Sequence, residues 1–307
     1  MIAGFFKQSK PIVYVILGLT LTLLFILELI EDFSPAMNWL NILIIFLKYF
    51  SLIGCFILFD YSLKYFEIQK KHSYGAFFFV LFSSFAMPEI IDSFIIIGFL
   101  IFSFGLMRLL FLTKIENPIL YIFESVFLML LSSLFYQPFL FFTILVLVAT
   151  IIFRTLQWRF IVAPILSISA SIIIIQLYQL IKFDKVVGLY FFMPELNFNI
   201  HLYYSQANFY LFIIWLLSTL LCIYQILRIK KKRSLYHKQI SSFFLYFLFL
   251  LFISFWLINI TSAGLFILSL WPLSIYLGDF LSRLKSRLWS EFVLWGFLII
   301  AFLNILF

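Results

Sequence analysis

Charged side chains are scarce in this sequence of 307 residues. Only 11% of the residues are Asp, Glu, Lys or Arg, about half the share that is usual in soluble domains. Hydrophobic residues make up 65% of the chain, and its mean hydropathy is +1.17. A chain with so few polar groups cannot cover its surface in water. The composition therefore excludes a water-soluble domain and predicts a protein embedded in a lipid bilayer.

Cysteine and histidine are also rare. The two cysteines, Cys55 and Cys222, lie inside apolar segments, which argues against a disulfide framework. The three histidines, His72, His201 and His237, are scattered, whereas a zinc or iron site needs three or more clustered ligands. The phosphate-binding and nucleophile patterns GxGxxG and GxSxG are absent as well. We therefore predict neither a metal nor another cofactor.

Apolar segments follow one another along the whole chain. With about 20 apolar residues as the length that crosses a bilayer, the sequence predicts eleven transmembrane helices, near residues 11–30, 39–59, 74–88, 94–112, 117–136, 138–156, 160–181, 209–228, 240–260, 264–282 and 290–307. No polar stretch is long enough for a second domain. The predicted fold is a single all-α domain over residues 1–307, a polytopic bundle of transmembrane helices.

Eighteen of the twenty-one Lys and Arg residues fall in alternate gaps between these segments. Basic residues of short loops remain in the cytoplasm during insertion, so the alternation places the amino terminus in the cytoplasm and Phe307 outside. The exceptions are Lys182 and Lys185, in an external gap, and Lys48, within the second segment. The excess of basic residues thus indicates orientation in a membrane and not a nucleic-acid partner.

Acidic residues favour the opposite, external side. Seven of the thirteen fall in external gaps, which contain few cations: Glu28, Glu31, Asp32, Glu89, Asp92, Asp184 and Glu195. The third segment is short for a span, and Pro88 favours an end to its helix. We predict an outward-facing acidic pocket with Glu31, Asp32, Glu89 and Asp92 as candidate catalytic residues. A tilted hairpin with its turn at the membrane surface is the alternative.

Two charged residues, Lys48 and Glu124, lie well inside predicted spans. Ionisable groups at such depth usually face the protein interior or a cavity and indicate function. We expect Lys48 to pair with the carboxylates after Pro88. Glu124 is expected to pair with Arg108 or Arg154, or to lean toward the inner surface. The alternative for both charges is a structural ion pair between helices.

The most polar gap, residues 182–208, contains Lys182, Lys185 and His201 among several aromatic residues. Cations and aromatic rings together suit a lipid phosphate that bears a sugar. An aromatic belt at the membrane interface is the other interpretation.

Four stretches resemble an uncharacterised multi-pass inner-membrane protein family of Bacteroidota: MIAGFFKQSKPI, KKHSYGAFFFVLFSSFAMPE, MRLLFLTKIENPILYIFESVFLMLLSSLFYQPFLFF and RTLQWRFIVAPILS. The resemblance implies a bacterial inner (cytoplasmic) membrane protein and leaves its activity open.

The outline also resembles multi-pass glycosyltransferases that use polyprenyl-phosphate sugars. Those enzymes have carboxylates in the first external loop, where this chain has Glu28, Glu31 and Asp32. The resemblance implies a carboxylate as general base, with Lys182, Lys185 and His201 holding the lipid phosphate. The chain lacks the large soluble domain of such enzymes.

Three functions remain open from the sequence. The first is a membrane subunit or an assembly factor for envelope biogenesis, the second a glycosyltransferase of this kind, and the third a transporter of lipid or a small solute. The expected partners are the bilayer, a polyprenyl-phosphate lipid and other membrane proteins. Nucleic acid is not expected.

Overall fold

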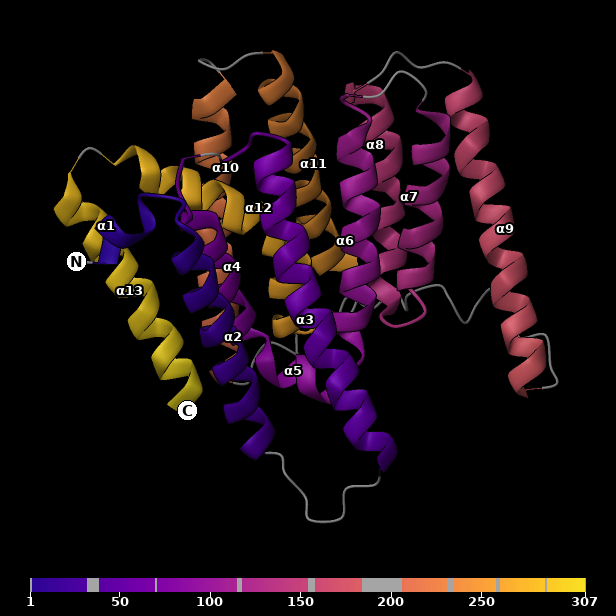
Figure 1. Cartoon of the computed structure of the whole chain (residues 1–307). Helices are drawn as coiled ribbons and strands as arrows, with labels where there is room; N and C mark the ends of the chain where they lie inside the picture. Colours follow the sequence, from indigo (N-terminus) through magenta and orange to yellow (C-terminus); the bar gives the residue numbers. More distant parts are fainter. Residues whose placement is uncertain are drawn as a thin grey trace. The chain divides into compact units, whose positions relative to one another are not determined.

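The computed structural model describes residues 2–31, 39–69, 71–114, 118–153, 158–183, 206–230, 235–257, 260–284 and 286–306. Within these ranges all regular secondary structure is helical (Figure 1). The elements in chain order are α1 (Ile2–Phe6), α2 (Pro11–Glu31), α3 (Trp39–Tyr65), α4 (Tyr74–Phe85), α5 (Met87–Asp92), α6 (Ile95–Phe111), α7 (Ile119–Ser132), the 3-10 helix η1 (Gln137–Thr143), α8 (Ile144–Phe153), α9 (Trp158–Phe183), α10 (Gln206–Lys230), α11 (Leu235–Leu257), α12 (Ser262–Arg283) and α13 (Arg287–Leu306).

Each predicted apolar segment coincides with one helix or with two consecutive short ones. The segment near 74–88 is divided between α4 and α5, and the one near 138–156 between η1 and α8. Among the described residues, five stretches are long and apolar enough to cross a membrane: Pro11–Ile30, Trp39–Tyr65, Tyr210–Arg228, Leu235–Leu257 and Gly264–Arg283. The all-α fold is thus confirmed. The number of eleven spans and the sides of the two termini remain predictions.

Bulky apolar side chains cover the outside of several helices. On α2, Leu19 is 64% exposed, and Ile12, Val15 and Leu23 of the same helix are exposed too. Phe292 of α13 is exposed in the same way. Lipid tails solvate such surfaces, whereas water does not. These helices therefore suit an integral membrane protein.

The chain packs as two compact units, each built from separate segments. Unit 1 comprises Met1–Ile96, Ile200–Lys231 and Thr261–Phe307, and unit 2 comprises Ile97–Asn199 and Lys232–Ile260. That the chain forms one membrane-embedded domain over residues 1–307 remains a prediction.

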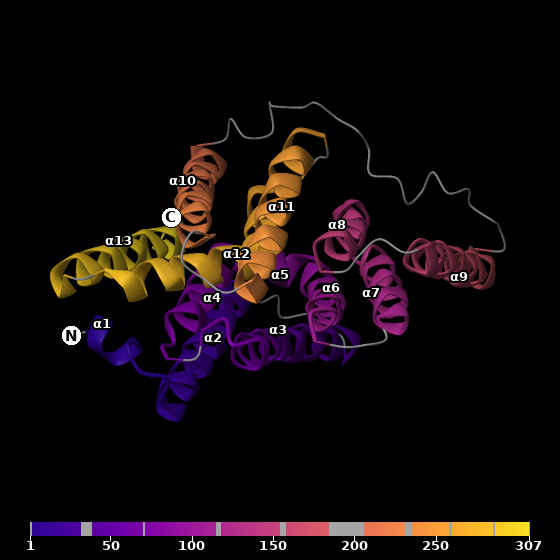
Figure 2. The ribbon, with the colours of Figure 1, turned by 90° about the horizontal axis from the view of Figure 1, so that it is seen from above.

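The core of unit 1 is the packing of α4 against α12 (Figures 1 and 2). Every residue of α4 is buried, so this helix contacts protein on all sides. Close approach depends on Gly278 of α12, because a Cβ there would lie 2.7 Å from the backbone nitrogen of Gly75 in α4. Small residues allow helices to approach closely within membranes. In unit 2, α7 packs against α9 and α8 against α11. Phenylalanine rings of α6, η1 and α11 form a cluster in the same unit.

Candidate functional site

The short helix α5 carries two of the predicted site residues. The helix α4 ends at Phe85, three residues before Pro88, which occupies the first turn of α5. Proline is tolerated there because the first turn leaves its N–H groups without helical partners. The 12 residues of α4 measure about 18 Å along the helix axis, less than the roughly 30 Å hydrocarbon core of a bilayer. Glu89 and Asp92 follow at this break.

Glu89 is half-buried and connects α5 to the start of α12. Its carboxylate accepts a hydrogen bond from the side chain of Thr261. Thr261 is also the N-cap of α12, where its Oγ1 accepts a hydrogen bond of 3.0 Å from the backbone N–H of Gly264. Burial raises the pKa of the Glu89 carboxyl above its ordinary value, the Thr261 hydrogen bond opposes the rise, and the negative charge of Asp92 adds to it.

The raised pKa of Glu89 makes stability depend on pH. A carboxyl with a higher pKa in the folded than in the unfolded protein contributes stability that is fully present below its ordinary pKa, and that is lost as the pH rises through the raised one. We expect the wild type to lose stability over this interval relative to Glu89→Gln, which has no titrating group there. Thermal unfolding in detergent over a pH series measures the difference. Parallel profiles for the two proteins would contradict the assignment.

Lys48 reaches α5 from α3. Its side chain is 5% exposed, and its Nζ donates a hydrogen bond to the carbonyl oxygen of Ile91. The ammonium group lies 5.1 Å from the centroid of the Phe94 ring and interacts electrostatically with Asp92. We expected Lys48 to pair with the carboxylates after Pro88; its direct acceptor is instead a backbone carbonyl of the helix that bears them. A cation at the C-terminal end of a helix also complements the helix dipole.

The other predicted members of the acidic pocket and of the lipid-phosphate site fall, in whole or in their side chains, outside the part of the chain that the structure describes. Glu31 is the last residue of α2 and Lys182 lies in the last turn of α9, but their side chains are outside the described part of the chain. Asp32, Lys185 and His201 lie outside the described residues altogether. A common pocket for these residues therefore remains a prediction.

Glu124 belongs to an ion pair in unit 2. Its Oε2 lies 2.9 Å from Nε of Arg108, and both side chains are partly exposed. The Arg108 guanidinium also lies 5.3 Å from the centroid of the Tyr121 ring. Of the two expected partners, the structure has Arg108, while Arg154 is outside the described residues. The pair joins α6 to α7, which suits a structural role.

Sequence reasoning missed a polar cluster in the core of unit 1. Asp279 of α12 is only 2% exposed, and its two carboxylate oxygens lie 3.8 Å from Nε2 of His72 and 4.0 Å from a guanidinium nitrogen of Arg283. Nearby, Gln69 donates a hydrogen bond to the carbonyl oxygen of Ile275. The sequence contains one indication of this cluster: Asp279 and Arg283 are four positions apart within an apolar segment, a spacing at which side chains meet on a helix. Among the described residues, no three His, Cys, Asp or Glu side chains gather closely enough to hold a metal.

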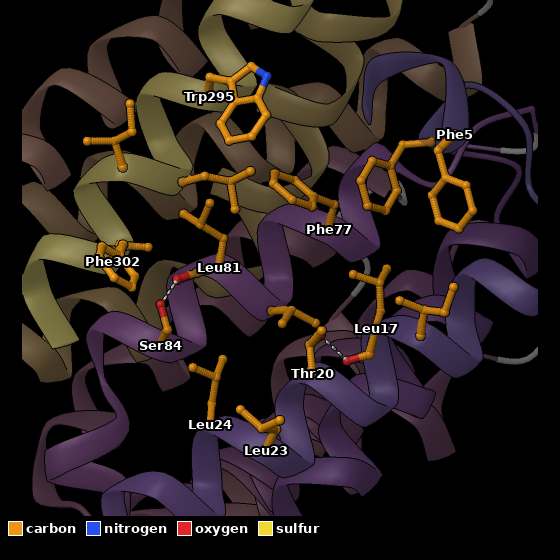
Figure 3. A pocket seen from close by; sticks show the side chains of 16 residues that line it. Phe5, Leu17, Thr20, Leu23, Leu24, Phe77, Leu81, Ser84, Trp295 and Phe302 are labelled. Carbon is orange, nitrogen blue, oxygen red and sulfur yellow. Dashed lines mark hydrogen bonds between the residues drawn. The ribbon is translucent and has the colours of Figure 1, made fainter. Parts of the chain in front are cut away.

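Unit 1 also contains an apolar groove of about 930 Å³ between α2, α4 and α13 (Figure 3). The ring of Phe6 lies 4.8 Å from that of Phe77, so α1 lies at the end of the groove where α4 begins. The two hydroxyl groups of the lining, on Thr20 and Ser84, donate to carbonyl oxygens of their own helices. Apart from the indole N–H of Trp295, the groove thus offers hydrocarbon surface with its hydroxyl groups already bonded. Its lining residues are Phe5, Phe6, Ile16, Leu17, Thr20, Leu23, Leu24, Phe77, Val80, Leu81, Ser84, Trp295, Leu298, Ile299, Ala301 and Phe302.

The membrane location rests on the apolar helices, and the candidate sites rest on the geometry of α5 and of the groove. The resemblances to a Bacteroidota membrane family and to polyprenyl-phosphate-sugar glycosyltransferases remain predictions. They have no independent support, because no protein-family model, no curated protein and no solved structure matches the chain.

Proposed function

We propose that this chain is a bacterial inner-membrane protein, a membrane subunit or an assembly factor of the envelope, and that it contacts its partner through the carboxylates of α5. The observation that supports the proposal best is the anchoring of α5 on two sides. Lys48 of α3 bonds the carbonyl of Ile91, and Glu89 bonds Thr261 at the start of α12.

Anchoring matters because a helix of six residues cannot hold its own conformation. Isolated helices shorter than about 12 residues are marginal even with favourable sequences. The buried ammonium of Lys48 would be costly without a partner, and its contact with α5 offsets that cost. The outcome is a fixed backbone from which Asp92 projects its exposed side chain. An anchored helix with an exposed acidic side chain is suited to binding.

The partner that fits this surface has a cationic side chain. Glu89 and Asp92 lie one turn apart on α5, and a Lys or Arg group of another membrane protein would form charge-assisted hydrogen bonds with Asp92. In the predicted topology this surface lies outside, where the chain itself has few cations. A partner would therefore meet little competition from the chain's own lysines and arginines.

Asp92→Asn is expected to weaken such a complex at least tenfold, which corresponds to about 1.4 kcal/mol. The change removes one exposed charge and keeps the shape of the side chain. Because Lys48 loses an electrostatic partner, thermal unfolding of the variant is measured beside binding to show that it is folded. Proteins that co-purify in mild detergent are quantified by mass spectrometry for the wild type, Asp92→Asn and the control Glu291→Gln in α13. A partner recovered with the wild type and the control but depleted with Asp92→Asn is the expected result. Equal recovery in all three, or no partner with the wild type, would contradict the proposal.

One observation favours the glycosyltransferase as a second candidate. Glu89 is half-buried and its pKa is raised, which brings the carboxylate closer to the basicity required of a general base near neutral pH. The two candidates differ in the residue on which they depend. A transferase would lose activity with Glu89→Gln, whereas the partner contact depends on the exposed Asp92. No feature of the described residues specifically favours the transporter.

A further inference from the structure

We propose that the groove between α2, α4 and α13 holds an acyl chain of an anionic phospholipid, whose head group lies at Lys7 and Lys10. The groove is lined almost wholly by hydrocarbon side chains (Figure 3). Its lining residues on α2 run from Ile16 to Leu24, about 12 Å along the helix axis. The inference is independent of the function proposed for α5.

The cations are fixed at one end of the groove by hydrogen bonds between distant segments. The backbone N–H of Ser73, which precedes α4, donates to the carbonyl oxygen of Phe6 over 3.0 Å, and its Oγ donates to the same oxygen over 3.2 Å. Lys7 follows Phe6 directly, and Lys10 directly precedes α2. Both lysines are exposed. The turn between α1 and α2 therefore holds the backbone of both lysines where the groove begins, with their side chains exposed.

Charge complementarity identifies the kind of head group. No acidic residue occurs before Glu28 in the sequence. Two carboxylates at this end of unit 1 are engaged by cations of their own: Asp60 lies 2.6 Å from Lys64, and Asp279 faces His72 and Arg283. Basic residues next to a membrane attract anionic lipids. The opposite end of the groove leads toward α5 and its carboxylates, which would repel a phosphate.

A lipid fits the groove better than a second copy of the chain. Helices that associate tightly in membranes meet through small residues, whereas the exposed positions along this groove include Ile16, Leu23 and Phe302. A flexible acyl chain adapts to such an uneven surface. Inside a bilayer it also requires no desolvation of polar groups. The occupant we infer is thus a single phospholipid with a net negative head group.

Trp295 lines the groove and provides the readout. Phosphatidylglycerol with brominated acyl chains quenches the fluorescence of nearby tryptophans. The part of this quenching that is lost in Trp295→Phe comes from Trp295 and therefore measures lipid in the groove. For purified, delipidated protein in mild detergent, we expect this part to appear at about tenfold lower concentration with brominated phosphatidylglycerol than with brominated phosphatidylcholine. Lys7→Gln with Lys10→Gln should abolish the difference. Thr20→Phe should block quenching by both lipids, whereas Leu19→Phe, a change at an exposed neighbour outside the lining, should not.

Three results would overturn the inference. Equal quenching of Trp295 by the two lipids, unchanged in the double lysine variant, would mean that lipid contacts the groove without head-group recognition. Quenching that persists in Thr20→Phe would place the acyl chain elsewhere. Absence of quenching together with a dimer in native mass spectrometry would assign the groove to a second copy of the chain.

Discussion

Lys48→Glu should lower the free energy of unfolding by about 3–5 kcal/mol, the range found when one partner of a buried charged contact is removed. The substitution replaces a donor with a carboxylate that faces the carbonyl oxygen of Ile91. It also places a second negative charge near Asp92, the group that interacts electrostatically with Lys48. Both effects oppose the packing of α5 against α3.

The two cysteines provide the measurement. Cys55 and Cys222 are both fully buried, with no exposed surface, so a thiol-reactive dye labels them only after unfolding. Cys55 lies on α3, seven residues after Lys48, and Cys222 lies on α10. The rate of labelling during a temperature ramp in detergent therefore reports the stability of unit 1 from two helices.

Lys48→Gln is the matched control for this prediction. Its neutral amide can still donate a hydrogen bond to the Ile91 carbonyl, so we expect a loss of only about 1 kcal/mol, the net value of one hydrogen bond. If the Glu and Gln variants unfolded at the same temperature, the charge at this position would have no stabilising role. The anchoring of α5 from α3 would then lose its support.

The helices of this chain were predictable because each is built from a long apolar run. The break between α4 and α5 was predictable as well, since Pro88 marks it in the sequence and the run before it is short. The direct acceptor of Lys48 was not predictable in the same way. Any carbonyl near the end of α5 can accept from an ammonium group, and the sequence does not record which backbone oxygen lies within reach.

The groove could not be predicted for a different reason. It forms where α2, α4 and α13 converge, although α2 ends at Glu31 and α13 begins only at Arg287. In a water-soluble helix the buried face is marked by a stripe of apolar residues. Here the exposed faces are apolar too, as with Leu19 on α2, so the sequence does not distinguish a lipid-facing side from one that lines a groove.

The cluster around Asp279 was missed because its members come from two ends of the sequence. His72 precedes α4, whereas Asp279 and Arg283 lie on α12. Each is unremarkable alone, since charged residues near the end of an apolar segment usually reach the membrane surface. The packing of α4 against α12 places the carboxylate in the core instead, between the imidazole of His72 and the guanidinium of Arg283.

Asp279→Lys should destabilise unit 1 as strongly as Lys48→Glu, by about 3–5 kcal/mol. The new ammonium group would lie in a nearly inaccessible position beside Arg283 and His72, in place of the carboxylate that faces them. It would also follow Gly278, whose neighbours in α4 leave no room for a shift of the helix. The thiol-labelling measurement described for Lys48 applies here too, since Cys222 lies against the carbonyl of Leu273 on α12.

Asp279→Asn separates the charge from the shape of this side chain. The amide fills the same space but removes the negative charge that faces His72 and Arg283, so we expect a smaller loss, of about 1–3 kcal/mol. Combining Asp279→Asn with Arg283→Gln should then cost less than the sum of the two single changes, because groups in contact are coupled. Strict additivity would mean that Arg283 does not interact with this carboxylate.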